Sequence, residues 1–215
     1  MNTMTAIIKT KEPRYVKLEL IGESGVIHKK ITLKNFIKIL TNSSEKDFCG
    51  VEIGSIPNGY YNAKIWEDGF SVIVSIQAGR YPFQFFDSIY LIPFPRLVFK
   101  FTCNNGKVDE KECYAVKDSS ITSSTKLYHY PFSNVHSNGK ICFGGNQLPK
   151  CSKISDVDKL VNLFYSSASN NDLWKSEYVK EAYPALRILL EELNGKDFFP
   201  VEYLEPYSKN ISELL

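Results

Sequence analysis

Among the cysteines of this sequence, the one within residues 130–146 has the surroundings that best suit a nucleophile. The stretch is polar and rich in turn residues, and its one cysteine, Cys142, stands between Ile141 and Phe143. An irregular segment of this kind inside a compact domain is more often functional than decorative. An exposed cysteine can act there, as its thiolate, as a nucleophile in acyl transfer. The alternative is a buried structural thiol, which is the usual state of a free cysteine.

The other cysteines and the three histidines show no spacing typical of a metal site or a disulfide framework. The five cysteines are odd in number, and no Cys-x-x-Cys occurs. We therefore expect no metal and no cofactor, and mostly reduced, buried thiols. A disulfide between Cys142 and Cys151 is disfavoured in a cytoplasmic compartment. His136 is placed to tune a proton near Cys142, although a lone loop histidine is more often a surface residue.

The residues before this segment predict short antiparallel strands joined by tight turns. Alternating apolar residues predict a strand pair over residues 15–21 and 26–31. Thr32 then caps a helix that ends near Asn42. The apolar face expected for that helix consists of Leu33, Phe36, Ile37 and Leu40. Further strands are expected over residues 60–66, 70–76, 81–86, 97–102, 113–116 and 126–130, with turns at Asp68-Gly69 and residues 104–106.

Two helices are predicted after Cys151. The first opens at residues 155–158, and the second spans residues 184–193 with Gly195 as its C-terminal cap. Their buried faces are expected to consist of Val157, Leu160, Val161 and Phe164, and of Leu186, Leu189, Leu190 and Leu193. Helices segregated from an antiparallel meander indicate an α+β fold. We expect residues 1–32 to form an N-terminal β extension packed on a core domain of residues 33–215.

Composition excludes several classes of protein. The 215 residues are 43% hydrophobic and 23% charged, which is ordinary for a globular chain. The net charge of +2 predicts no strong attraction to nucleic acid or to anionic membranes. No signal-peptide pattern opens the sequence, and no run approaches the roughly 18 apolar residues that span a bilayer. A cytoplasmic location is therefore expected.

The segment around Cys142 resembles the active-site region of ubiquitin-conjugating enzymes. That family has a His-Pro-Asn motif, then a turn ending in Gly, then an apolar residue and the catalytic cysteine. Asn134 stands eight residues before Cys142, as in the family. The resemblance is closest to the bacterial branch found as protein B of the PRTRC system. The matching residues are Phe94-Pro95 before a strand, Leu127-Tyr128, Pro131-Phe132-Ser133-Asn134-Val135 and Gly139-Lys140-Ile141-Cys142-Phe143-Gly144.

This resemblance implies a fold, an activity and a set of partners. The fold would be the ubiquitin-conjugating (UBC-like) fold, with residues 33–215 as the catalytic domain. Cys142 would accept a ubiquitin-like protein as a thioester from a ThiF-type activating enzyme and pass it to an amine. A JAB-type metalloprotease in the same operon would be a further partner.

The resemblance also implies roles for residues around the nucleophile. Asn134 would stabilise the oxyanion of the transfer step, and the alternative is that it only holds the loop. Gly144 and Gly145 would let a glycine-rich tail approach closely.

One departure from the family keeps other functions open. Phe132 and Ser133 occupy the positions of the family's His and Pro. A non-catalytic UBC-like module that binds a ubiquitin-like protein is therefore an alternative to the transferase. A thiol hydrolase is another, and it would need His129 or His136 beside Cys142.

Overall fold

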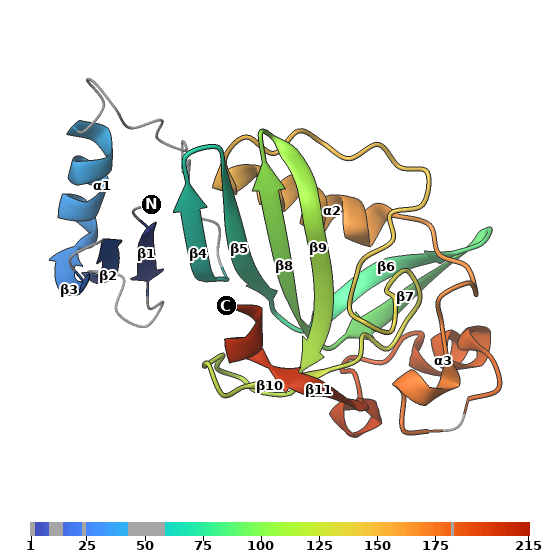
Figure 1. Ribbon diagram of the computed structural model, residues 1–215. Helices are drawn as coiled ribbons and strands as arrows, with labels where there is room; N and C mark the ends of the chain where they lie inside the picture. The colour runs from blue at the N-terminus through green and yellow to red at the C-terminus, as the bar shows by residue number, and fades with distance from the viewer. Residues whose placement is uncertain (1–2, 9–14, 23–24, 43–58, 182) are drawn as a thin grey trace. The chain divides into compact units, whose positions relative to one another are not determined.

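The computed structural model describes the chain except for residues 1–2, 9–14, 23–24, 43–58 and 182. The fold is mixed α+β, as the sequence predicts, with antiparallel strands and few helices (Figure 1). Two compact units contribute to it. One consists of Met1–Val74, Phe101–Asp109 and Lys150–Val157, and the other of Ser75–Lys100, Glu110–Pro149 and Asp158–Leu215. Three strands supply residues to both units: β5 (Gly69–Ile76), β8 (Arg96–Asn104) and β9 (Lys107–Val116). The predicted boundary after residue 32 stays a prediction.

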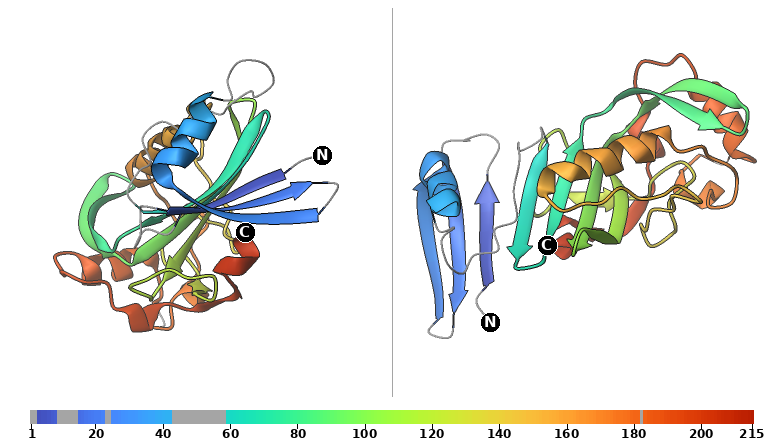
Figure 2. Two further views of the ribbon diagram at one scale, coloured as in Figure 1. Left: turned by 90° about the vertical axis from the view of Figure 1, so that its left-hand side faces the viewer. Right: turned by 90° about the horizontal axis from the view of Figure 1, so that it is seen from above.

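The first unit contains an antiparallel sheet in the order β3-β2-β1-β4-β5. The predicted strand pair is confirmed as β2 and β3, and β1 is an additional strand that pairs with both β2 and β4. Helix α1 contacts β2 and β3 (Figure 2). The elements are β1 (Thr3–Ile8), β2 (Tyr15–Gly22), β3 (Gly25–Thr32), α1 (Leu33–Asn42), β4 (Tyr60–Trp66) and β5 (Gly69–Ile76).

The start of α1 confirms its predicted cap but not its whole apolar face. Thr32 Oγ1 accepts a 3.1 Å hydrogen bond from the backbone N–H of Asn35, which satisfies a free donor of the first turn. Phe36 is buried, whereas Ile37 is 50% exposed. The prediction that Ile37 faces the core was wrong, and the buried face of α1 is narrower than the apolar spacing predicts.

Two hairpin turns in the first unit follow local turn chemistry. Between β4 and β5 the turn residues are Glu67 and Asp68, so the predicted Asp68-Gly69 turn was one residue out of place. Gly69 instead opens β5, where a Cβ would lie 2.3 Å from the carbonyl oxygen of Cys103. The turn between β8 and β9 is confirmed. Asn105 and Gly106 have φ of 50° and 74°, as a type I′ turn requires.

The second unit contains a sheet in the order β8-β9-β10-β11 and a separate two-stranded sheet of β6 and β7. The predicted continuous meander was wrong at this point, because β6 and β7 form a sheet of their own and β8 follows β5 in the sheet order. Strand β7 was missed because it contains Pro93, which a two-stranded ribbon tolerates. The strands are β6 (Gly79–Phe85), β7 (Ser88–Phe94), β8 (Arg96–Asn104), β9 (Lys107–Val116), β10 (Lys126–Tyr128) and β11 (Pro206–Asn210).

The helices of the C-terminal part bury the predicted faces. Helix α2 (Val157–Ser166) packs on β8, and the rings of Phe164 and Phe99 lie 5.2 Å apart (Figure 2). Helix α3 (Leu186–Leu193) buries all four predicted leucines but begins after Pro184. Gly195 follows it with φ of 83°, the left-handed conformation of a helix cap. Short 3-10 helices are Ile154–Asp156, Ser176–Tyr178, Val201–Tyr203 and Ile211–Leu214.

Within the part of the chain that the structure describes, no helix is both long and apolar enough to cross a membrane.

Candidate active site

Cys142 ends a small hairpin that begins at Asn134. The backbone N–H of Cys142 donates a 2.8 Å hydrogen bond to the carbonyl oxygen of Asn134. Val135 and Ile141 form the next antiparallel bridge, and the N–H of His136 donates to the carbonyl of Lys140 at 2.9 Å. The spacing of eight residues between Asn134 and Cys142 is therefore the length of one closed hairpin.

The hairpin is fixed to the edge of β9. The N–H of Cys113 donates to the carbonyl of Gly139 at 2.9 Å, and the N–H of Ile141 donates to the carbonyl of Lys111 at 2.8 Å. Gly139 has φ of 84°, and a Cβ there would lie 2.2 Å from Cζ of Tyr114. Only glycine fits this position without rearrangement.

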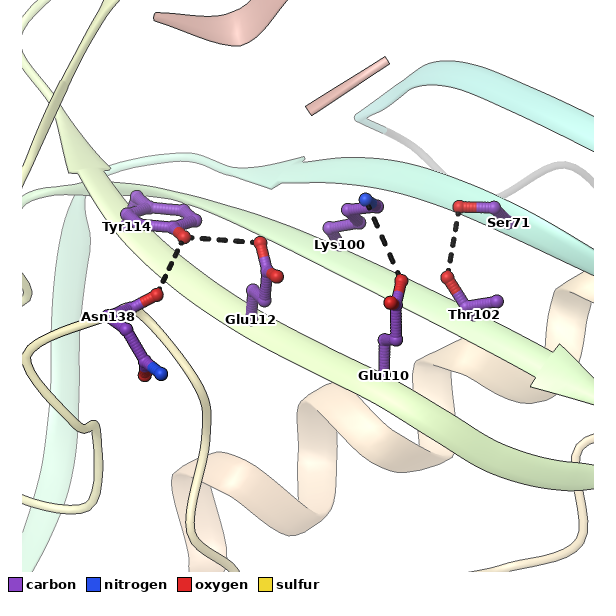
Figure 3. Close-up of polar contacts among 7 residues, drawn as sticks. All are labelled: Ser71, Lys100, Thr102, Glu110, Glu112, Tyr114 and Asn138. Carbon is purple, nitrogen blue, oxygen red and sulfur yellow. Dashed lines mark hydrogen bonds and ion pairs between the residues drawn. The ribbon is translucent and has the colours of Figure 1, made fainter. Parts of the chain in front are cut away.

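Tyr114 is the polar anchor beneath the turn. Its hydroxyl lies 3.1 Å from both the carbonyl oxygen of Asn138 and a carboxylate oxygen of Glu112 (Figure 3). Burial, followed by the charge of Glu112, raises the pKa of Tyr114. The phenol therefore stays protonated and remains a hydrogen-bond donor at neutral pH.

Cys142 differs in exposure from the other described cysteines. Its side chain is partly exposed, whereas Cys103, Cys113 and Cys151 are buried. Burial raises the pKa of the Cys113 thiol, which keeps that thiol neutral and unreactive. The predicted burial is confirmed for these three thiols, and Cys49 lies outside the described residues. Cys142 is thus the thiol, among the four described, that solvent and a partner can reach.

The side chain of Asn134 points to the segment after α2. Its Nδ2 donates to the carbonyl oxygen of Ala168 at 3.1 Å and to Oγ of Ser169 at 2.9 Å. Its backbone has φ of 70°, a left-handed conformation that asparagine tolerates better than most residues. Both hydrogens of the Asn134 side-chain amide are used in these bonds. One of the two bonds must break before Asn134 can donate to an oxyanion. That catalytic role stays a prediction.

The two loop histidines have different surroundings. His136 is exposed on the hairpin, and its backbone N–H and C=O both bond within the turn. His129 stacks on Tyr178 with ring centroids 4.9 Å apart and meets Tyr207 edge-on at 5.0 Å. These aromatic contacts hold the imidazole of His129, and they give no support to its use as the base of a thiol hydrolase.

Gly144 and Gly145 follow the nucleophile and are both exposed. A Cβ built on either glycine meets no atom within 4 Å. Gly144 has φ of 58°, which itself favours glycine, whereas Gly145 is outside the left-handed region. Packing within the described chain therefore gives no reason for glycine at residue 145.

Phe132 and Ser133, at the positions of the family's His and Pro, are both fully buried. The Phe132 ring lies 5.0 Å from Phe94 and 5.3 Å from Phe83, in a cluster that also includes Tyr130 and Phe199. Ser133 Oγ has no hydrogen-bond partner among the described residues. The ring of Phe132 thus anchors the irregular segment before the hairpin in the aromatic cluster.

Sequence reasoning missed Asn146, Ser167 and Ser169. Asn146 Nδ2 donates to Ser167 Oγ at 3.1 Å, and Ser169 Oγ accepts from Asn134. The serine-rich stretch after α2 was the sequence feature that could have pointed to these contacts. A serine in a loop has many possible hydrogen-bond partners, however, and residue spacing along the chain does not select one of them. No group of three or more His, Cys, Asp or Glu suited to a metal ion occurs among the described residues.

Fold and site together define a mixed α+β protein whose accessible thiol, among the four cysteines described, lies on a short hairpin. The family model described as Prokaryotic E2 family D matches residues 62–207, more than half of the chain. The chain belongs to this family of prokaryotic ubiquitin-conjugating-like (E2-like) proteins. Both Asn134 and Cys142 lie within the matched residues. Searches of curated proteins and of solved structures found no match.

Proposed function

We propose that this chain is a ubiquitin-conjugating-like transferase that carries a ubiquitin-like protein as a thioester on Cys142. The observation that carries the proposal is the partly exposed Cys142 on a hairpin closed by Asn134, inside the region matched by an E2-like family. The three other described cysteines are buried, so Cys142 is the acceptor that a bulky partner can reach.

The reaction consists of two acyl transfers. The Cys142 thiolate attacks the thioester carbonyl on the activating enzyme, and the thiolate of that enzyme leaves. An acceptor amine then attacks the new thioester, the Cys142 thiolate leaves, and the amine loses a proton to solvent or to a base. Negative charge develops on the carbonyl oxygen in both steps, where an amide donor such as Asn134 would stabilise it.

The partners in this proposal are a ubiquitin-like protein and a ThiF-type activating enzyme, with a JAB-type metalloprotease encoded nearby. The PRTRC-type motif around Cys142 is the ground for this set. The open space around Gly144 and Gly145 suits an extended, glycine-rich tail beside the thiol. We place the reaction in the cytoplasm, on a UBC-like core that carries the N-terminal strands as an extension.

The test is charging in the presence of ATP, with the activating enzyme and ubiquitin-like protein encoded beside the gene. We expect an adduct on the wild type that a reducing agent cleaves. Cys142→Ser should give a more stable oxyester or no adduct, whereas the control Cys151→Ser should still charge. Equal charging of Cys142→Ala would exclude Cys142 as the acceptor.

A non-catalytic module is the second candidate, favoured by the buried Phe132 at the family's His position. Such a module would bind the ubiquitin-like protein without forming an adduct. Calorimetry would measure binding of the ubiquitin-like protein, and a parallel reaction would show whether an adduct forms that a reducing agent cleaves. Binding without such an adduct, while the activating enzyme itself is charged, would favour this candidate over the transferase.

A further inference from the structure

Two asparagines on either side of Cys142 are bound to the same three-residue segment. Asn134, before the nucleophile, donates to Ala168 and Ser169 at 3.1 and 2.9 Å. Asn146, after the nucleophile, donates to Oγ of Ser167 at 3.1 Å. Both ends of the Cys142 loop are therefore held by residues 167–169, which directly follow α2.

Residues 167–169 are themselves fixed from two directions. Ser167 Oγ donates to the carbonyl of Leu163 in the last turn of α2 at 2.6 Å. Ser169 bonds through its backbone to the end of β6 and to the residue after it, donating to Gln84 O at 2.9 Å and accepting from the N–H of Phe86 at 3.0 Å. Ser167 and Ser169 are 9% and 5% exposed. Buried acceptors held by a helix and a strand make a rigid support for a loop.

The path from this segment to the nucleophile is short. Ser169 holds the Asn134 side chain, and the Asn134 carbonyl accepts the hydrogen bond from the Cys142 N–H. Loss of the Ser169 acceptor would leave the Asn134 side chain with its bond to the Ala168 carbonyl alone, and the support of the Cys142 backbone would weaken. Small displacements of a reacting group have large effects on rate.

We propose that Ser167 and Ser169 are positioning residues that hold the Cys142 loop in the geometry used for acyl transfer. The catalytic part of this proposal rests on the proposed function, whereas the positioning of Cys142 is measurable without it. Each serine acts through an asparagine, Ser169 through Asn134 and Ser167 through Asn146, and neither touches the thiol in the described contacts.

The test compares Ser169→Ala and Ser167→Ala with Ser166→Ala. Ser166 is a matched control because its Oγ also bonds to the carbonyl of Leu163, at 3.2 Å, but it is exposed and is not bonded to Asn134 or Asn146. Hydrogen exchange of the Cys142 amide and the pH profile of Cys142 alkylation by iodoacetamide report on positioning. Single-turnover discharge of the thioester to free lysine reports on transfer.

We expect Ser169→Ala to speed exchange of the Cys142 amide and to slow discharge by roughly five- to tenfold, as for one lost hydrogen bond. Asn134→Ala combined with Ser169→Ala should cost little more than Asn134→Ala alone, because both changes break the same contact. Ser166→Ala should match the wild type. Ser167→Ala and Asn146→Ala should shift Cys142 alkylation similarly to each other, and they supply the test if Ser169→Ala does not fold.

Unchanged exchange and alkylation in folded Ser169→Ala and Ser167→Ala would overturn the proposal. So would purely additive effects of Asn134→Ala and Ser169→Ala. If the wild type forms no thioester, the transferase function fails, but the exchange and alkylation measurements still decide whether the serines position Cys142.

Discussion

The N–H of Cys142 bonds to the carbonyl oxygen of Asn134 at 2.8 Å, while the side chain of Asn134 bonds to Ser169 at 2.9 Å. One residue thus connects the nucleophile's backbone to the segment after α2. The backbone contact survives any substitution of Asn134 except those that break the hairpin, whereas the side-chain contacts are removed by alanine. Asn134→Ala therefore removes the loop support and the candidate oxyanion donor together, and comparison with Ser169→Ala, which removes only part of the loop support, separates the two roles.

The first prediction concerns Asn134→Ala. If Asn134 supplies an oxyanion donor, discharge of the thioester to free lysine should slow by about 10² to 10³. Charging should slow less, because thiolate attack is intrinsically easy whereas a lysine amine is mostly protonated near neutral pH. Single-turnover discharge across a pH series measures the effect. A slowing no larger than the roughly five- to tenfold expected for Ser169→Ala, together with a lower melting temperature, would assign Asn134 to loop support only.

Gly139→Ala is expected to destabilise the protein strongly. The new Cβ would lie 2.2 Å from Cζ of Tyr114, and the backbone has φ of 84°. A left-handed non-glycine residue and an overpacked contact together cost about 2 to 5 kcal/mol. Urea unfolding followed by fluorescence measures the loss in free energy of unfolding. Stability equal to wild type would show that the hairpin does not seat on Tyr114 in this way.

Gly145→Ala should leave stability unchanged and slow charging. Its Cβ meets nothing within 4 Å, and its backbone needs no left-handed conformation. A methyl group there contacts nothing in the described chain, so slower charging would report an obstructed partner, such as the tail of the ubiquitin-like protein. Gly145→Val should slow charging further. Charging at the wild-type rate in both variants would exclude a path for the tail over this residue.

Stability should fall as the pH drops through the titration range of His129. Burial, the largest cause, lowers the pKa of His129, and the nearby carboxylates of Glu205 and Glu177 oppose this only in part. The unfolded chain, with a histidine pKa near 6.5, therefore binds a proton more readily than the folded one. The free energy of unfolding should be highest above pH 6.5 and decline from there toward the lower folded pKa.

The matched variant for this prediction is His129→Phe. Phenylalanine keeps a flat ring between Tyr178 and Tyr207 but carries no proton, so the decline between pH 7 and pH 5 should become shallower. Urea unfolding at a series of pH values measures both chains. An identical pH dependence in the two proteins would show that His129 does not contribute to it.

Local patterns in the sequence determined several parts of this protein correctly. The pair Asn105-Gly106 predicted the hairpin between β8 and β9, because both residues accept a positive φ. The spacing of the leucines in α3 predicted the buried face of that helix, because a helix repeats every 3.6 residues. The spacing of Asn134 and Cys142 pointed to a prokaryotic E2-like family, which the match over residues 62–207 confirms at family level. Each of these signals lies within a short stretch of chain.

Contacts between distant stretches were decided only by the tertiary structure. The pairing of β6 with β7 alone, the burial of Phe132 among other aromatic rings, and the bonds of Asn134 and Asn146 to Ser169 and Ser167 all depend on which segments meet. A serine or asparagine can bond to many partners, and an aromatic ring can pack in many clusters, so residue type alone leaves the choice open. The contact partners are fixed when the whole chain folds and buries its apolar surface. Polar groups that are buried in the process then form hydrogen bonds with the groups nearest to them.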